Sequence, residues 1–304
     1  MHILAAYDGS PYSDYAIEAL RRLPHRERVD LSLVTVTVFS SMAAWVATNH
    51  AQYGTQLIEP QRAADGRRLE KIADKVRADF RSVRTHLLNG APGVEIVKFA
   101  SEHPPDLVIC GAIGRSAIAR VLLGSVSDYV ATSADCSVLV VRPPEDFSSV
   151  AASPEAQPPS PMLPQRVLVG IGNAETDGRL TDWIERLRLA PETQVDLVYV
   201  MEKRPEYELD LLRSASAYWK EVRSVAAEHI ETVTETLTAA GHRVEAELVE
   251  APHIGAALAE HARKQATDLI IVGDQRQSMV QRVLLGSTSR HVLRHGPCSV
   301  LIAR

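Results

Sequence analysis

The chain has 304 residues, 45% apolar and 23% charged, a globular composition that excludes a disordered or collagen-like chain. Lys and Arg number 33 against 38 Asp and Glu, and the resulting charge of −5 gives no electrostatic reason to expect nucleic acid or an anionic membrane as a partner. Because no apolar run approaches the roughly 18 residues of a membrane-spanning helix and the N-terminus does not resemble a signal peptide, we expect a soluble, cytoplasmic protein.

In the first 142 residues, short apolar runs alternate with longer amphipathic stretches. The first run, Ile3–Tyr7, leads through Asp8-Gly9-Ser10 into a helical stretch over Asp14–Leu23. Further strands are predicted, and a helix between them is indicated by the spacing of Leu69, Ile72, Ala73, Val76 and Phe80. The predicted strands are Leu31–Val38, Arg84–Leu88, Leu107–Cys110 and Val138–Val141. Their Val, Ile and Leu content, without strict alternation, is typical of strands buried on both faces. This order predicts an α/β domain with a parallel sheet and helices on both faces, whose ligand lies beyond the carboxyl ends of the strands where the strand order reverses.

A glycine pattern follows the strand Leu107–Cys110. Gly111, Gly114 and Gly124 are followed by Ser125, in the spacing G-x2-G-x9-G-S. Glycines at this position let backbone N–H groups approach phosphate oxygens. Ser125 is expected to cap the next helix, whose N-terminus favours an anion. The pattern therefore predicts a triphosphate site, against the alternative that the glycines only make turns.

Asp8 follows the first strand directly, at the same edge of the predicted sheet. Its carboxylate is placed to accept hydrogen bonds from an adenine amino group or a ribose hydroxyl. The alternative is a helix cap, provided by Asp8 or by Ser10. The glycine pattern elsewhere in the same copy favours the ligand-binding role.

The whole pattern is written twice. Asp106–Gly111 recurs 162 residues later as Asp268–Gly273, and Val121–Ser125 recurs unchanged as Val283–Ser287. The intervening segment, residues 143–165, contains seven prolines and is predicted to be a linker. We therefore expect domains at 1–142 and 166–304.

These motifs resemble those of the universal stress protein family, in its tandem two-domain form. The resemblance rests on Asp8-Gly9-Ser10, on Gly111 through Ser125, and on the final strand Cys136–Arg142. It implies two Rossmann-like domains of the adenine nucleotide alpha hydrolase-like type, each a five-stranded parallel sheet that holds ATP. By position, Asp8 and the backbone of Val36 would hold adenine and Gly111 would lie beside the ribose. The phosphates would be held by Gly114, Gly124, Ser125 and Ser127.

The second copy departs from this pattern at two positions. Asp8 is replaced by Gly172, and Gly114 is replaced by Arg276. The arginine would occupy space that a phosphate loop needs, although its charge could also attract a phosphate. We expect ATP in the first domain and a mainly structural second domain.

Other chemistries find little support in the sequence. It contains no P-loop with its lysine and no G-x-S-x-G elbow. His291 and His295 have a spacing that could place two imidazoles on a metal, but a solvated or capping role is favoured and no metal site is predicted. No catalytic residue is identified. Mg²⁺ is the cation that would accompany the phosphates, and no dedicated ligand set for it is visible.

The expected function is that of a nucleotide-dependent stress regulator with little hydrolysis. The alternatives are a slow ATPase or an adenylate-forming enzyme of the related α/β ATP-pyrophosphatase type, and a scaffold without a ligand. In this family the last strands of two domains pair across a two-fold axis, so the resemblance implies an internal pseudo-dimer. Exposed strand edges would also permit a homodimer.

Overall fold

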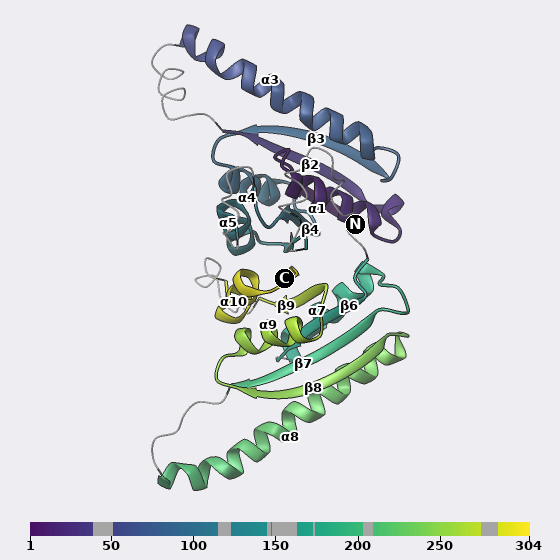
Figure 1. The fold of residues 1–304 in the computed structure, drawn as a ribbon, viewed down its shortest axis with the longest axis vertical. Coiled ribbons are helices and arrows are strands. Elements are labelled where there is room, and N and C mark those ends of the chain that lie inside the picture. Colours follow the sequence, from purple (N-terminus) through teal and green to yellow (C-terminus); the bar gives the residue numbers. More distant parts are fainter. Residues whose placement is uncertain are drawn as a thin grey trace. The chain divides into compact units, whose positions relative to one another are not determined.

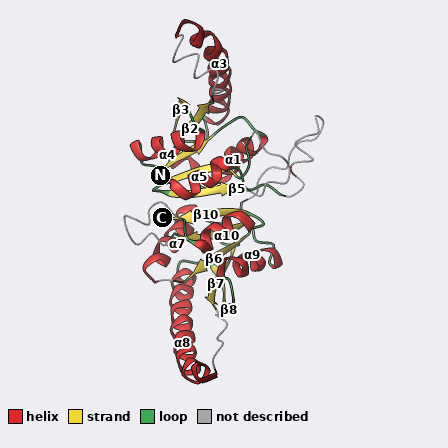
Figure 2. Ribbon diagram, turned by 90° about the vertical axis from the view of Figure 1, so that its left-hand side faces the viewer, coloured by secondary structure: helices red, strands yellow, loops and turns green. Residues whose placement is uncertain are grey.

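The computed structural model describes residues 1–38, 51–114, 123–144, 147, 163–172, 174–202, 209–274 and 285–304, with the backbone alone for 51–58, 174–176 and 209–218. The chain divides into two units, Met1–Met162 and Leu163–Arg304, whose ribbons are drawn in Figures 1 and 2. Within these described ranges, no helix has the length and apolar character needed to cross a membrane.

Unit 1 alternates strands and helices, as the sequence predicts. Its strands are β1 (His2–Ala6), β2 (Asp30–Thr37), β3 (Ser82–Asn89), β4 (Leu107–Gly111) and β5 (Ser137–Val141). Its helices are α1 (Pro11–Arg22), the 3₁₀ turn η1 (Arg26–Arg28), α3 (Ala51–Val76), α4 (Pro92–Glu102) and α5 (Ser125–Ser133).

The strands of unit 1 form a parallel sheet in the order β3-β2-β1-β4-β5. Helices α1 and α3 pack on one face of this sheet, and α4 and α5 pack on the other. The chain runs from β1 outward to β3 and then returns to place β4 on the other side of β1. The strand order therefore reverses between β1 and β4, which is where such sheets bind ligands.

Both faces of the sheet are covered, and the strand sequences explain why. Ile3, Leu4 and Ala5 of β1 are at most 1% exposed, as are Leu107, Val108 and Ile109 of β4. Such continuous apolar runs are stable only when helices cover the strand on both sides.

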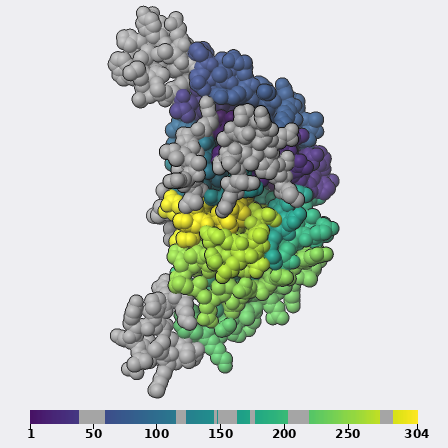
Figure 3. Space-filling model, in the orientation of Figure 1, coloured from purple at the N-terminus to yellow at the C-terminus, as the bar shows by residue number. Residues whose placement is uncertain are grey.

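Unit 2 repeats this architecture. Its strands are β6 (Arg166–Ile171), β7 (Gln194–Glu202), β8 (Arg243–Ala251), β9 (Leu269–Gly273) and β10 (Ser299–Ala303). They are parallel, in the order β8-β7-β6-β9-β10. One face is covered by α7 (Ala174–Leu187) and α8 (Leu209–Ala239), and the other by α9 (Ile254–Lys264) and α10 (Ser287–His295). In Figure 3, the yellow-green and yellow side chains from this C-terminal part form the visible surface over that sheet. The prediction of two Rossmann-like α/β domains with helices on both faces is thus confirmed.

One residue of the predicted linker is part of a domain. Phe147 is 1% exposed, and its ring packs against Tyr12 and Tyr15 of α1 at centroid distances of 5.4 and 5.1 Å. The rest of 148–162 lies outside the described residues. The packing of Phe147 attaches the start of the proline-rich segment to unit 1.

Candidate functional site

The sequence-predicted site of unit 1 lies at the carboxyl ends of β1 and β4. Asp8 follows β1 and Gly114 follows β4, and an ideal Cβ added to Gly114 would lie 3.0 Å from Oδ2 of Asp8. The two candidate residues, more than a hundred positions apart in the sequence, are therefore neighbours. The Asp8 carboxylate also accepts a hydrogen bond from the Ser10 N–H at 2.9 Å, which orients it at the edge of the turn.

Ser10, and not Asp8, caps α1. The Ser10 side chain accepts a hydrogen bond from the Ser13 N–H at 3.2 Å, and Pro11 occupies the start of the helix. Because the cap is supplied by Ser10, the carboxylate of Asp8 is not required for that purpose.

A residue that the sequence analysis missed reaches this turn from α3. Gly9 has a φ of +75°, a conformation that favours glycine, and an ideal Cβ there would lie 3.2 Å from Cδ of Arg68. Arg68 forms an ion pair with Asp65, which is 2% exposed and also accepts from Gln61 at 3.1 Å. Arg68 thus brings a held guanidinium to the Asp8 turn. The signal in the sequence was Asp65 on the buried side of the helix, one turn before Arg68.

The glycine loop closes on itself. The Gly124 N–H donates to the Ala112 carbonyl at 2.7 Å, and an ideal Cβ on Gly124 would lie 3.2 Å from that oxygen. The Ser127 hydroxyl, 3% exposed, lies 2.9 Å from the carbonyls of both Ala112 and Gly124. Ser127 therefore holds the two ends of the loop together, and this engages the hydroxyl proton that was expected to reach a phosphate. The segment 115–122 lies outside the described residues.

Helix α5 begins one residue earlier than expected. Gly124 is the N-cap and makes no side-chain cap, while Ser125 is the first helical residue, so the expectation that Ser125 caps this helix is wrong. The first hydrogen bond of the helix runs from the Asp128 N–H to the Gly124 carbonyl at 2.9 Å. The N–H groups of the preceding residues Ser125 and Val126 are thus free of intrahelical partners.

Val36 lies near the end of β2, past the point where β1 stops. The Tyr7 N–H donates to the Val34 carbonyl at 2.8 Å, so Val34 faces β1. Alternate residues of a strand direct their backbone groups to the same side, and Val36 therefore turns its N–H and carbonyl toward the space beyond β1. The Tyr7 carbonyl itself accepts from the Thr35 hydroxyl at 2.7 Å.

A buried acid and phenol lie beneath the same turn. The Tyr7 hydroxyl donates to Asp14 at 3.0 Å. Burial, with the nearby Asp14 charge, raises the pKa of Tyr7, and burial also raises the pKa of Asp14. Tyr7 therefore remains a protonated donor at neutral pH.

Unit 2 contains a cavity of about 350 Å³ at the corresponding edge of its sheet. Its lining includes the repeat counterparts of six of the seven predicted site residues, which are Gly172, Val200, Gly273, Gly286, Ser287 and Ser289. The counterpart of Gly114, Arg276, lies outside the described residues. The candidate positions of both copies thus gather at one place in the fold.

The polar groups around the second site differ from those of the first. Asp177 of α7, 3% exposed, accepts from the Gly172 N–H at 3.0 Å and lies 2.7 Å from Nε2 of His229 on α8. Asp274, which replaces Ala112, is 2% exposed and pairs with Nε of Arg304 at 2.9 Å. The second copy has therefore been rebuilt around two buried acids.

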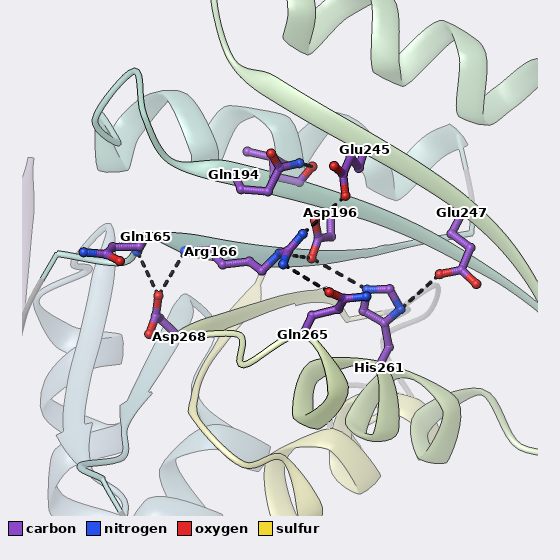
Figure 4. Close-up of polar contacts among 10 residues, drawn as sticks. Gln165, Arg166, Gln194, Asp196, Glu245, Glu247, His261, Gln265 and Asp268 are labelled. Carbon is purple, nitrogen blue, oxygen red and sulfur yellow. Dashed lines mark hydrogen bonds and ion pairs between the residues drawn. The ribbon is translucent and has the colours of Figure 1, made fainter.

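Two further polar groups of unit 2 lie outside this cavity. His253, His291 and His295 stack with centroid distances of 4.6 and 4.5 Å. Near the start of β6, Arg166 pairs with Asp196 at 2.8 Å, and His261 lies between Asp196 and Glu247 (Figure 4). Over the described part of the chain, no three His, Cys, Asp or Glu side chains form a group that could hold a metal ion.

Comparison with known proteins shows the same duplication. The family model described as the universal stress protein family matches residues 1–142 and again residues 164–304. A relative from Staphylococcus haemolyticus that carries the universal stress protein name is 34% identical over 159 residues, which cover 51% of this chain and 93% of the relative. A universal stress protein of Methanocaldococcus jannaschii is 27% identical over 143 residues, covering 47% of this chain and 82% of the relative.

Among solved structures, full-length likeness is found at low identity. The crystal structure of a universal stress protein from Archaeoglobus fulgidus covers 100% of this chain and 98% of its own, with a TM-score of 0.64 and 17% identity. A functionally unknown protein from Pseudomonas aeruginosa covers 99% of this chain and 92% of its own, with a TM-score of 0.61 and 12% identity. At these identities the likeness concerns the fold alone.

Proposed function

Because the chain belongs to the universal stress protein family, with its domain present twice, we propose that the N-terminal domain binds ATP and that its occupancy regulates a stress response with little hydrolysis. The observation that carries this proposal is the convergence of Asp8 and Gly114, whose missing Cβ would lie 3.0 Å from the carboxylate. A carboxylate beside a glycine loop and a helix start suits a molecule with a hydrogen-bonding base or sugar at one end and phosphates at the other.

Each group has a role in this proposal. Asp8 and the backbone of Val36 bind the adenine end, and Gly111 lies beside the ribose. Gly114, Gly124 and the free N–H groups at the start of α5, with the Ser125 hydroxyl, receive the phosphates. Ser127 holds the loop closed, and Arg68 adds a positive charge that favours the anionic ligand. Mg²⁺ is held mainly by the phosphates when it accompanies them.

We propose binding of one ATP per chain. The second copy lacks the carboxylate of Asp8 and the glycine of Gly114, because Gly172 and Arg276 stand there. Two acids, Asp177 and Glu202, line its cavity instead. Negative charge at that site disfavours a triphosphate.

The test is direct identification of nucleotide followed by a charge perturbation at Gly114. Mass spectrometry of small molecules released from purified protein is expected to find ATP, and calorimetric titration of emptied protein is expected to give one site. In Gly114→Glu, a negative charge about 5 Å from a phosphate costs about 3 kcal/mol at an effective dielectric constant of 20, which is a loss of about 100-fold in affinity.

Two matched variants separate charge from bulk and from net charge. Gly114→Gln adds the same bulk without the charge and is expected to lose less affinity than Gly114→Glu. Gly178→Glu adds the charge on an exposed helix position of unit 2 and is expected to bind ATP normally. A folded Gly114→Glu protein with unchanged ATP affinity, or a titration with two equivalent sites, would contradict the proposal.

A further inference from the structure

The cavity of unit 2 is the largest unassigned feature in the described part of the chain that bears on binding. Its volume of about 350 Å³ falls within the range of small-molecule sites. Its walls are mainly apolar and include Val198, Val222, Leu258 and Val272, with Trp219 of α8 at one side. Such walls suit a flat ring system rather than a hydrated, flexible chain.

The strand ends offer hydrogen-bonding groups for the edge of such a ring. Gln194 donates to the Gln165 carbonyl at 2.8 Å, so residues of β7 with even numbers face β6. Because β6 ends at Ile171, opposite Tyr199, the backbone groups of Val200 and Glu202 face the cavity beyond it. A heterocycle with an amino group beside a ring nitrogen matches a backbone carbonyl and N–H on one strand.

The opposite wall is formed by the start of α10. Ser287, Thr288 and Ser289 line the cavity there. The Ser289 hydroxyl is bonded to the Gly273 carbonyl at 2.7 Å, as Ser127 is to the loop of unit 1. The Ser287 and Thr288 side chains are groups of the kind that bind sugar hydroxyls.

The charge of the cavity distinguishes it from the site in unit 1. Among the described residues that line it, Asp177 and Glu202 are acidic and none is Lys or Arg. The buried residues of α3 and α8 match at a spacing of 161, pairing Leu69 with Ile230 and Val76 with Leu237, so Arg68 corresponds to His229. The guanidinium of unit 1 is thus replaced by an imidazole held by Asp177. Burial, together with the Asp177 charge, also raises the pKa of Tyr199 in the cavity wall.

Gly172 leaves the mouth of the cavity open. An ideal Cβ on Gly172 would meet nothing within 4 Å, whereas Gly114 in unit 1 abuts Asp8. An ideal Cβ on Gly286 likewise meets nothing within 4 Å, although its counterpart Gly124 is in close contact with Ala112. The second copy has kept the cleft and opened it at the positions where the first copy is tight.

We propose that unit 2 binds a nucleoside or a similar aminated heterocycle that carries no phosphate chain. The ring lies between Trp219 and the strand ends, its edge is bound by the backbone of Val200, and its sugar meets the start of α10. The carboxylates of Asp177 and Glu202 exclude phosphates by charge. This inference rests on the cavity of unit 2 and does not depend on ATP binding in unit 1.

The test is calorimetric titration of the full chain carrying Gly114→Glu with adenosine, AMP and ATP as probes. Adenosine is expected to bind about tenfold or more tightly than ATP, which is the discrimination that one unscreened like charge at about 10 Å provides at an effective dielectric constant of 20. Adding Gly172→Leu fills the open mouth and is expected to remove the adenosine heat. The matched control Gly178→Leu, also at a glycine with nothing within 4 Å but outside the cavity, is expected to leave it unchanged.

A second variant tests the charge without touching the cavity walls. Glu202 is exposed, and Glu202→Gln is expected to strengthen AMP binding relative to adenosine by several-fold while circular dichroism stays unchanged. ATP binding more tightly than adenosine, adenosine heat that persists in folded Gly172→Leu, or no adenosine heat at millimolar concentration would each overturn the proposal. ATP titration of the unmutated chain reports unit 1 separately, so failure of one proposal is distinguishable from failure of the other.

Discussion

Gly111 is a position where the fold excludes even a single methyl group. An ideal Cβ there would lie 2.9 Å from the carbonyl oxygen of Tyr12 and 3.0 Å from its carbonyl carbon, whereas a relaxed contact between such atoms is about 3.5 Å. Gly111→Ala therefore requires α1 to move away from β4 by roughly half an ångström. Since Tyr12 is backbone in contact here and its ring packs against buried Phe147, this movement cannot be absorbed by one side-chain rotation.

The magnitude follows from the packing of α1. Ile17 and Leu20 on the same helix are at most 2% exposed, so displacing the helix disturbs a close-packed layer. Insertion of a methyl group into such a layer costs about 1–3 kcal/mol. For a domain of this size, each kcal/mol lowers the melting temperature by about 2–4 °C.

Hydrogen exchange of the native protein measures this loss in each unit separately, because protected amides report the opening of their own region. Gly111→Ala is expected to lower the protection of β1 and β4 amides and to leave those of β6 and β9 unchanged. The matched control is Gly178→Ala in α7, where nothing lies within 4 Å of the added Cβ and a gain of about 0.5–1 kcal/mol is expected. A Gly111→Ala protein as stable as the control would refute the steric reasoning.

Three further outcomes are expected. ATP turnover by purified protein stays well below about 1 s⁻¹, because backbone amides and hydroxyls bind ground and transition states about equally; phosphate release of several per second that Ser125→Ala abolishes would make the first domain an ATPase. Asp196→Ala leaves the partly buried Arg166 of Figure 4 without its nearest acid and is expected to cost about 3 kcal/mol in urea unfolding, whereas Arg166→Met combined with Asp196→Leu recovers most of it; equal losses would contradict the pairing. Burial, with His295 and His253 nearby, lowers the pKa of His291 below its ordinary 6.5, so the unfolded chain takes up this proton first and the stability of unit 2 falls as the pH drops through about 6.5. His291→Gln is expected to flatten that fall, and an unchanged pH profile would refute it.

Much of the site could be located from the sequence because its main features are local. The repeat, the buried strands and the loop from Gly111 to Ser125 are each set by a short run of residues. In a parallel sheet, residues that follow neighbouring strands meet at one edge, and this places Asp8 near Gly114 without knowledge of the side chains. The replacement of both residues in the second copy is likewise visible in the chain alone.

The tertiary structure decided which side chains reach that edge from a distance. Arg68 arrives from α3, about sixty residues from Asp8, and helical periodicity indicates its face but not the turn on which it packs. The Ser127 hydroxyl is directed inward by the Ala112 carbonyl, a partner that only the closed loop supplies. Likewise, Asp177 and His229 meet because α7 and α8 cover the same face of one sheet. The sequence by itself determined two copies of one α/β domain and the loop where a ligand belongs, because these depend on local periodicity and turn chemistry. The charge and openness of each site depend on side chains brought together from separate helices, and only the packed structure determined them.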